Sequence, residues 1–312
     1  GDNNTAVGSS SMTSNTTGTA NTGIGSTSLA SNTSGQENTS VGHASLFYNS
    51  DGDWNTAIGG NSLFSNQGGD ANVGVGYNAL FSNTTGDNNI AIGAVSLYSN
   101  TTGTRNIAIG RGAYDSGDDE NDNLALGYDA LGGISLNGAE RNIAIGNYSL
   151  DAITSGDNNT ALGYNAMITC TTGFNNTAVG YKALTSLTQT TESTQNASSN
   201  TAVGNEALTA VTTGYSNTGI GRDALKSVNT GFNNIAVGRN TFQNLTTGQS
   251  NIGIGSNTVG SIVETGSNNI IIGSADVDVG NTSATNQIVI GHGARGHGNN
   301  VVVIGNGSCT AW

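Results

Sequence analysis

The sequence contains no proline, only two cysteines and few charged residues, which make up 9% of its 312 positions. An ordinary globular domain has about a quarter charged residues. Because proline cannot donate a backbone N–H to a β-ladder, its absence is typical of a chain whose amides nearly all take part in ladders. Abundant glycine and asparagine would suggest disorder. Here, however, aliphatic residues return at a fixed interval, which disordered polar tracts have no reason to do.

Basic residues are also scarce: 21 acidic residues stand against 8 basic ones, so the formal net charge is −13. A polyanion is unsuited to nucleic acid, because Lys and Arg on phosphates supply most of that affinity. No apolar run of about 18 residues is present, so we expect no membrane insertion. The sequence begins and ends within a repeat, without a cap or targeting segment, and we expect a segment of a longer polypeptide.

What is present is a seventeen-residue repeat, close to Asn-Thr-Ala-Val-Gly-x-x-Ala-Leu-x-x-Asn-Thr-Thr-Gly-x-Asn. Its eighteen copies have closing glycines at Gly8, Gly25, Gly42, Gly59, Gly76, Gly93, Gly110, Gly127, Gly146, Gly163, Gly180, Gly204, Gly221, Gly238, Gly255, Gly273, Gly291 and Gly305. A short period without helical stretches predicts a solenoid, in which each copy forms one coil that is stable only against its neighbours. We therefore predict an all-β solenoid, or β-roll, of about 18 coils in a single repeat array, residues 1–312.

The segment Asn89–Arg105 shows what one copy encodes. Its run Ile90–Ile92 predicts a strand with bulky aliphatic residues on one face and a small residue on the other. The small residue is mostly Ala or Gly, and such a face permits close approach of another backbone. The pair Ser96–Leu97 predicts a second short strand, Gly93 a corner and Asn100–Gly103 a turn. At about 3.3 Å per residue, the coil is too thin for a ligand cavity.

Asparagine precedes the closing glycine by four residues in sixteen of the eighteen copies; Gln287 and Val301 are the exceptions. In stacked coils these side chains would form a ladder of amide hydrogen bonds along the solenoid axis. The alternative is that they contact a ligand, but a ligand rarely requires so many equivalent donors.

The two cysteines, Cys170 and Cys309, are eight coils apart. That separation is roughly 38 Å, far beyond disulfide reach within one chain. We expect buried free thiols, although equivalent cysteines could meet in a symmetric trimer.

The strand motif Asn-x-Ala-Ile-Gly resembles the head repeats of trimeric autotransporter adhesins, the YadA-like left-handed β-rolls. Those have shorter coils, and the last coils here, residues 274–305, come closer to that spacing, with fourteen residues from Gly291 to Gly305. The longer form, Asn-Thr-Ala-Val-Gly-Tyr-Asn-Ala-Leu with Asn-Thr-Thr-Gly, is similar to the repeat shafts of phage tail-fibre proteins.

This resemblance implies a homotrimer, with three β-rolls packed about a common axis. It implies an extracellular fibre shaft that presents a receptor-recognition tip, in a virion as a tail fibre or on a bacterial surface as an adhesin. Partners would be other fibre or baseplate proteins and a host or surface glycan. We expect no enzyme activity, no cofactor and no metal. Eighteen coils at about 4.8 Å each would span roughly 85 Å.

Insertions into the repeat lie on the surface and often carry the specificity of a repeat protein. The largest lies between Gly180 and Gly204, and a smaller one lies around Gly133–Asn137. Each is more simply a tolerated loop without a role, and the alternative is contact with a glycan or surface receptor. The candidate receptor-contact residues in the larger insertion are Thr188, Gln189, Thr190, Thr191, Glu192 and Ser193.

Two further groups have side chains that could bind metal ions. The acidic tract Asp118–Asp122 has carboxylates that suit Ca²⁺, but it lacks the spacing of an EF-hand and is more simply a solvated turn. His292 and His297 flank a short Gly-Ala-Arg-Gly segment and could form a ring of histidines in a trimer, while His43 is isolated.

Two other classes of function remain as alternatives. A phage depolymerase would need paired carboxylates facing one another, and the acidic residues here lie mostly in turns without such a recurring pair. An ice-binding solenoid would need outward Thr pairs in every coil; Thr84–Thr85 and Thr101–Thr102 recur, but several coils lack them.

Overall fold

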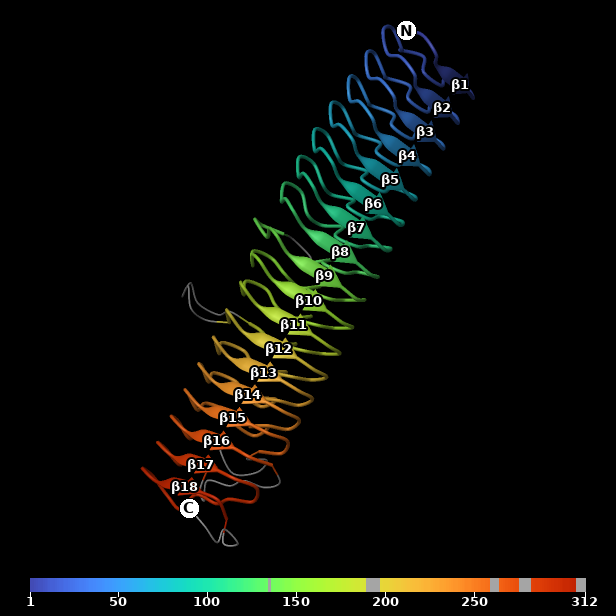
Figure 1. The fold of residues 1–312 in the computed structure, drawn as a ribbon. Helices are drawn as coiled ribbons and strands as arrows, with labels where there is room; N and C mark the ends of the chain where they lie inside the picture. Colours follow the sequence, from blue (N-terminus) through green and yellow to red (C-terminus); the bar gives the residue numbers. More distant parts are fainter. Residues whose placement is uncertain (134–135, 189–196, 259–263, 275–281, 307–312) are drawn as a thin grey trace. The chain divides into compact units, whose positions relative to one another are not determined.

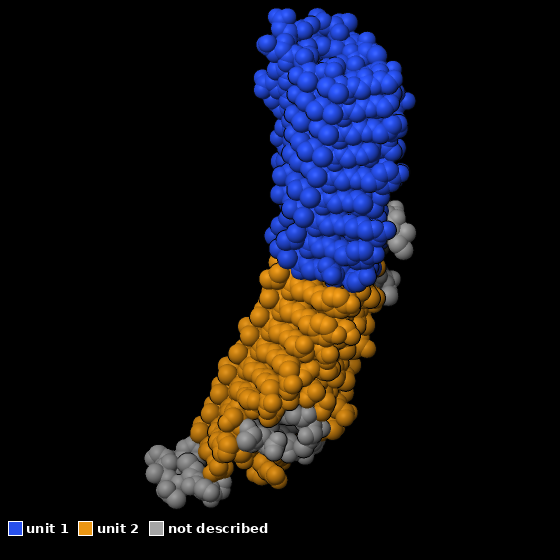
Figure 2. All heavy atoms as spheres, turned by 90° about the vertical axis from the view of Figure 1, so that its right-hand side faces the viewer, with its two compact units in different colours: residues 1–157 blue, residues 158–312 orange. Residues whose placement is uncertain are grey.

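The structure is a computed structural model that describes residues 1–133, 136–188, 197–258, 264–274 and 282–306. It divides into two compact units, Gly1–Asp157 and Asn158–Trp312 (Figure 2). Both units are built from the same kind of coil, and the described residues contain no helix. Accordingly, no helix in this part of the chain is long and apolar enough to cross a membrane. The prediction of an all-β solenoid with a repeat of about seventeen residues is confirmed.

Each coil contributes one three-residue strand (Figure 1). The strands of the first unit are β1 Thr5–Val7, β2 Thr22–Ile24, β3 Thr39–Val41, β4 Thr56–Ile58, β5 Val73–Val75, β6 Ile90–Ile92, β7 Ile107–Ile109, β8 Leu124–Leu126 and β9 Ile143–Ile145. Those of the second are β10 Thr160–Leu162, β11 Thr177–Val179, β12 Thr201–Val203, β13 Thr218–Ile220, β14 Ile235–Val237, β15 Ile252–Ile254, β16 Ile270–Ile272, β17 Ile288–Ile290 and β18 Val302–Ile304.

Neighbouring strands within each unit pair in parallel and in register. Ile90 of β6 lies opposite Ile107 of β7, and Ile252 of β15 lies opposite Ile270 of β16. Equivalent side chains of consecutive coils therefore stack in columns. The columns, rather than single residues, are the units of packing in this fold.

In most coils the interior is filled by a small middle residue of the strand and by a leucine on the opposite wall, whereas β16 and β17 place Ile271 and Val289 there. Ala91 and Leu97 are both fully buried, as are their equivalents in most coils. A Cβ added at Gly74, another middle residue, would meet the side chains of Ser62 and Leu63. The expectation that the Ala/Gly face lies open to another backbone is therefore wrong, because that face points into the coil.

The segment predicted as a second strand is a turn. Leu97 has a φ of 48°, in the left-handed region, so the backbone there is not extended. Its N–H still donates to the carbonyl of Ala113 in the next coil, at 3.1 Å. The alternation of small and large residues in Ser96–Leu97 was read as a strand period, but it reflects one inward side chain at a tight corner.

Left-handed residues recur two positions before each such leucine. Asn61, Asn78 and Val95 occupy this position in consecutive coils, with φ values of 54°, 54° and 55°. Asn61 Nδ2 also donates to Asn78 Oδ1 at 3.1 Å. Asparagine tolerates this conformation well, whereas a β-branched residue such as valine is strained in it.

We therefore expect Val95→Asn to raise the free energy of unfolding by about 1 kcal/mol, because it relieves backbone strain and can extend the amide pair of Asn61 and Asn78. Denaturant unfolding of the wild-type and variant chains measures the difference. Val95→Thr, which keeps the β-branch, should show no gain. An equal gain from both variants would contradict the explanation by strain.

The predicted asparagine ladder is confirmed. Asn89 N–H donates to Asn72 Oδ1 at 2.9 Å, and Asn72 Nδ2 donates to the carbonyl of Gly86 at 2.7 Å. Each amide thus satisfies backbone groups of the following coil. Gln287 takes the same place, and its N–H donates to Asn269 Oδ1 at 3.1 Å. These asparagines are buried, so they do not offer a row of contacts to a ligand.

A second buried column changes its chemistry along the chain. In the first coils it is a column of amides, in which Asn83 Nδ2 donates to Asn66 Oδ1 at 2.7 Å and Asn100 Nδ2 to Asn83 Oδ1 at 2.8 Å. It ends where Gly117 replaces asparagine and the ring of Tyr114 occupies the space. Aliphatic or thiol side chains then take the position: Leu136 and Ile153 in the first unit, and Cys170, Leu187, Val211, Val228 and Leu245 in the second.

Candidate functional site

The most extensive candidate site is the outward side of the strands, which we call the sheet face: the first and third residues of each strand. Its third residues include Val7, Ile92 and Ile254, which are 56%, 39% and 42% exposed. The first residues are mostly half-buried by their neighbours in the column, as Ile90 and Ile107 are. The third residues therefore form an aliphatic column in each unit that the described coils leave uncovered, and in β5–β9 and β14–β18 the first residues add a second aliphatic column. Contiguous exposed apolar surfaces are the common setting of protein interfaces, which makes the sheet face a candidate site.

No residue of the sheet face is ionisable: every first or third residue of the eighteen strands is Thr, Val, Ile or Leu. The charges of the chain, which sum to −13, lie elsewhere. The face can consequently be buried without removing an ionised group from water.

The sheet face has two kinds of zone, which follow one another in the same order in both units. In the Thr zones, β1–β4 and β10–β13, each strand begins with threonine and ends with an aliphatic residue. In the aliphatic zones, β5–β9 and β14–β18, both positions are Val, Ile or Leu. The described structure shows no hydrogen bond for the strand threonine hydroxyls. In the sequence the two kinds of zone differ as Thr-x-Val and Ile-x-Ile, so the signal is present there.

A second surface column is aromatic and is confined to the first unit. Phe47, Phe64, Phe81 and Tyr98 stack in consecutive coils, with ring centroids 5.1 to 5.3 Å apart and planes within 15° of parallel. Tyr48 contacts the edge of this stack at Phe47 and Phe64. Because the rings cover one another's faces, only their edges are available to a ligand. The stacking instead joins consecutive coils. Its spacing of seventeen residues was visible in the sequence.

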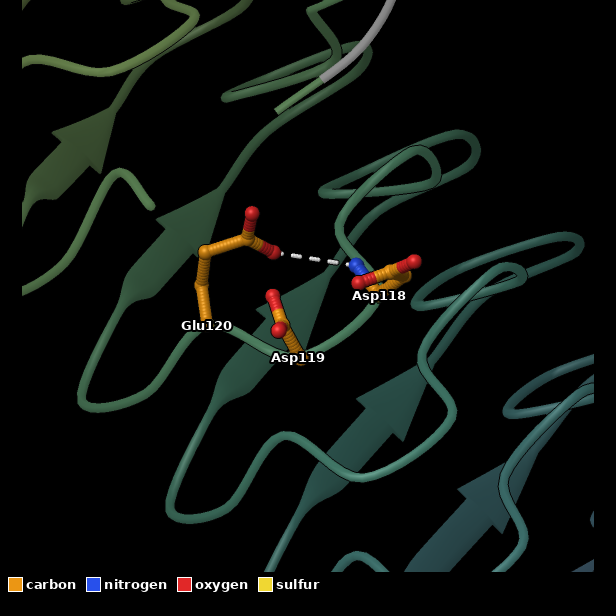
Figure 3. A group of neighbouring side chains, drawn as sticks. All are labelled: Asp118, Asp119 and Glu120. Carbon is orange, nitrogen blue, oxygen red and sulfur yellow. Dashed lines mark hydrogen bonds between the residues drawn. The ribbon is translucent and has the colours of Figure 1, made fainter. Parts of the chain in front are cut away.

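The acidic tract places three carboxylates together at one turn. Oxygens of Asp118, Asp119 and Glu120 lie within 4.8 Å of one another (Figure 3). Glu120 is buried, and its two oxygens accept hydrogen bonds from the backbone N–H groups of Asp118, at 2.9 Å, and Gly138, at 3.1 Å. Burial and the neighbouring Asp119 raise the pKa of the Asp118 carboxyl.

The rest of the predicted tract points elsewhere. Asp122 forms a two-pronged ion pair with Arg105 at 2.6 and 2.8 Å, which lowers the pKa of its carboxyl. Asn121 Oδ1 accepts the N–H of Thr104 at 2.8 Å. Because each oxygen of Glu120 accepts a backbone N–H, its carboxylate closes the turn. The two exposed aspartates alone fall short of the six to eight oxygens, roughly, that Ca²⁺ takes.

A separate carboxylate group involves Asp115, Asp129 and Asp151 of adjacent coils. Partial burial, with the charges of Asp129 and then Asp151, raises the pKa of Asp115 to about 6, and Arg111 opposes the shift. Burial and Asp129 also raise the pKa of Asp151. The folded chain therefore holds a proton on Asp115 over a pH range in which the unfolded chain has lost it.

We expect stability to fall as pH rises from about 4 to 6 and to level off above that range. The unfolded chain releases the Asp115 proton near 3.8 and the folded chain near 6, so deprotonation favours unfolding. Asp115→Asn should remove most of this fall and stabilise the chain at pH 7 by about 1 kcal/mol, allowing for solvent screening. Thermal melts from pH 4 to 8 measure it. The exposed variant Asp2→Asn should keep the fall, and an unchanged profile in Asp115→Asn would contradict the assignment.

The other predicted site residues are not brought into a common site. Of the candidate contact loop, Thr188 donates its N–H to Thr212 O at 3.1 Å, whereas Gln189, Thr190, Thr191, Glu192 and Ser193 lie outside the described residues. His292 Nδ1 lies 3.2 Å from Ser274 Oγ, and His297 lines a shallow recess with Arg295. In the described ranges, the acidic turn is the only metal-type group found, and it includes no histidine.

Two further expectations concern thiols and threonines. Cys170 is buried and free, and burial raises the pKa of its thiol to about 12, whereas Cys309 lies outside the described residues. In the Thr-Thr pairs, the first hydroxyl is used within the fold: Thr84 Oγ1 donates to Thr101 O at 2.9 Å. One hydroxyl of such a pair is therefore used within the fold and is not part of a free outward row of the kind an ice-binding face requires.

Comparison of the chain with protein-family models finds no match, and comparison with curated proteins finds none either.

Proposed function

We propose that this chain is a structural segment of an extracellular fibre, a homotrimeric shaft that holds a receptor-recognition tip away from its anchor. The observation that carries the proposal is the uncharged sheet face, which runs through the strands of both units. A single solenoid needs only its interior buried, so the outward aliphatic column, with a second one beside it in the aliphatic zones, supports a partner that covers it. The trimeric state and the role in a fibre rest on the resemblance of the repeat to tail-fibre shafts and adhesin heads.

The interior supports a mechanical rather than a catalytic role. Buried amides such as Asn72 and Asn89 join each coil to the next through backbone hydrogen bonds. These buried polar groups bind neighbouring coils to each other. In the acidic turn, the Glu120 carboxylate accepts two backbone N–H groups. We therefore propose no enzyme activity, no cofactor, and a role in attachment.

Within this proposal a phage tail fibre comes first, with host attachment through a tip or glycan-binding partner and connection to other fibre or baseplate proteins. The head of a bacterial trimeric adhesin is the second candidate, favoured by the fourteen-residue spacing from Gly291 to Gly305. Antibodies raised against the chain would separate the two: labelling of virus particles supports the fibre, and labelling of bacterial surfaces supports the adhesin.

The mass of the native particle tests the trimer. Light scattering should give about three times the 31.2 kDa of one chain. Ile92→Asp, which places a charge on the sheet face, should shift the particle to a single chain, because an ionised carboxylate would be buried in the interface without a partner. The matched change Tyr77→Asp, at an exposed residue off the sheet face, should leave the trimer intact. A monomeric wild-type chain would sink the proposal.

A further inference from the structure

A shaft made of near-identical coils faces a problem of register. If copies of the chain associate through the sheet face, sliding one copy along another by one coil, about 4.8 Å, brings strand against strand again. Aliphatic columns alone would accept each such position. A chain that assembles into a defined fibre needs a feature that distinguishes the aligned position from the shifted ones.

We infer that the Thr zones of the sheet face set the register in which a second copy of this chain docks on it. This inference rests on the proposed self-association and adds what aligns the copies. In the aligned arrangement, Thr zones meet Thr zones and aliphatic zones meet aliphatic zones. In a shifted arrangement, strands at each zone boundary, such as β4 and β5, face the wrong kind of neighbour.

The chemistry of the mismatch is specific. The hydroxyls of Thr22, Thr39 and Thr56 have no hydrogen-bond partner among the described residues, so a facing threonine can supply one. Opposite Ile90 or Ile107, the same hydroxyl would be buried without a partner, which disfavours that pairing. A polar residue in an otherwise apolar interface fixes register in coiled coils by this same principle.

A second copy is the occupant that the face fits. Its columns repeat at the coil spacing along both units, and a surface with the same spacing and the same order of zones is another copy of this chain. The absence of ionisable residues on the face lets two chains of charge −13 approach there without placing like charges in contact.

Cross-linking between differently marked chains tests the register. In a background of Cys170→Val and Cys309→Ser, one chain carries Thr22→Cys and a longer tagged chain carries Thr56→Cys. These positions are two coils, or roughly 9.6 Å, apart along the strand stack, beyond the approximately 7 Å limit for a disulfide. After co-refolding and mild oxidation, we expect disulfides between like positions and none between unlike ones.

In both marked chains, the other zone threonines are then changed to isoleucine; these are Thr5, Thr39, Thr160, Thr177, Thr201 and Thr218. This variant should lose the discrimination, so that unlike cross-links approach the yield of like ones. A matched variant with serine at the same six positions keeps the hydroxyls and should retain the discrimination.

The outcomes separate this inference from the proposed trimer. A three-chain particle in which unlike positions cross-link as readily as like ones overturns the register role and leaves the trimer standing. A three-chain particle with neither cross-link also overturns it, because the sheet face is then not the contact. A single-chain mass removes the proposed function itself.

Discussion

Replacing Gly59 with alanine is expected to destabilise the first unit by about 4 kcal/mol, a large effect for one methyl group. Gly59 directly follows β4 and has a φ of 131°, which L-residues rarely adopt. A Cβ there would lie 2.5 Å from the carbonyl oxygen of Gly76 in the next coil. That atom belongs to the backbone of a stacked coil, so it cannot move aside without opening the ladder.

The neighbouring glycine provides the control. A Cβ on Gly60 would meet only the ring of Tyr77, at 3.6 Å, and its backbone is not in the restricted region. Gly60→Ala should therefore change the free energy of unfolding by less than about 0.5 kcal/mol. Denaturant unfolding followed by far-ultraviolet circular dichroism compares the two. Equal losses would mean that the corner tolerates a side chain and that the seventeen-residue glycine period has another cause.

Replacing Asn72 with leucine is expected to cost about 2 kcal/mol, although leucine is of similar size and more apolar. Asn72 Oδ1 accepts the N–H of Asn89, and its Nδ2 donates to Gly86 O. Leucine would leave that buried N–H without an acceptor, whereas Gly86 O keeps a second donor in Asn83 Nδ2 at 3.0 Å. An unsatisfied buried N–H costs about 1 to 3 kcal/mol, and the hydrogen bond that joins the two coils is lost with it.

The second amide column offers a matched substitution. Asn100→Leu also replaces a fully buried asparagine. Because Asn100 is the last residue of its column, its Oδ1 accepts no hydrogen bond in the wild-type chain. The chain itself places Leu136 at this position further along. Leucine would remove the donor to Asn83 Oδ1, but Gly103 O keeps the Nδ2 of Asn89 and no backbone N–H loses its acceptor. The cost should be about 1 kcal/mol, because a buried acceptor without a partner is tolerated better than a buried N–H. If Asn100→Leu is as costly as Asn72→Leu, the special role of the first ladder is wrong. Hydrogen exchange at the Asn89 amide would report the lost bond directly.

The repeat made the fold predictable because it restricts side chains to columns. The strands, the corner glycines and the asparagine ladder all follow from a period that stacking requires. The interior was misjudged at the strand and at the leucine corner. Alternation alone cannot say which side of a three-residue strand faces inward, and the left-handed φ of Leu97 leaves no trace in its residue type.

The candidate sites were less predictable than the fold. The sequence identifies the acidic tract but not the different roles of its residues. Glu120 turns inward to backbone donors, whereas Asp122 pairs with Arg105 one coil away. The carboxylates of Asp115, Asp129 and Asp151 were missed because they come from different coils and do not share one repeat position. The apolar character of the sheet face could be predicted from one repeat, whereas its Thr zones are a property of several consecutive coils stacked in register.

The asparagine ladder has a consequence for how the chain acquires its structure. Nearly every bond it makes joins residues about one repeat apart, as between Asn72 and Asn89. Each coil thus needs only its predecessor as a template, and folding can advance one repeat at a time as the chain leaves the ribosome. In such a process, the last folded coil is the surface on which the next coil forms. Damage to one coil, as at Gly59, would interrupt everything synthesised after it while leaving the earlier coils intact.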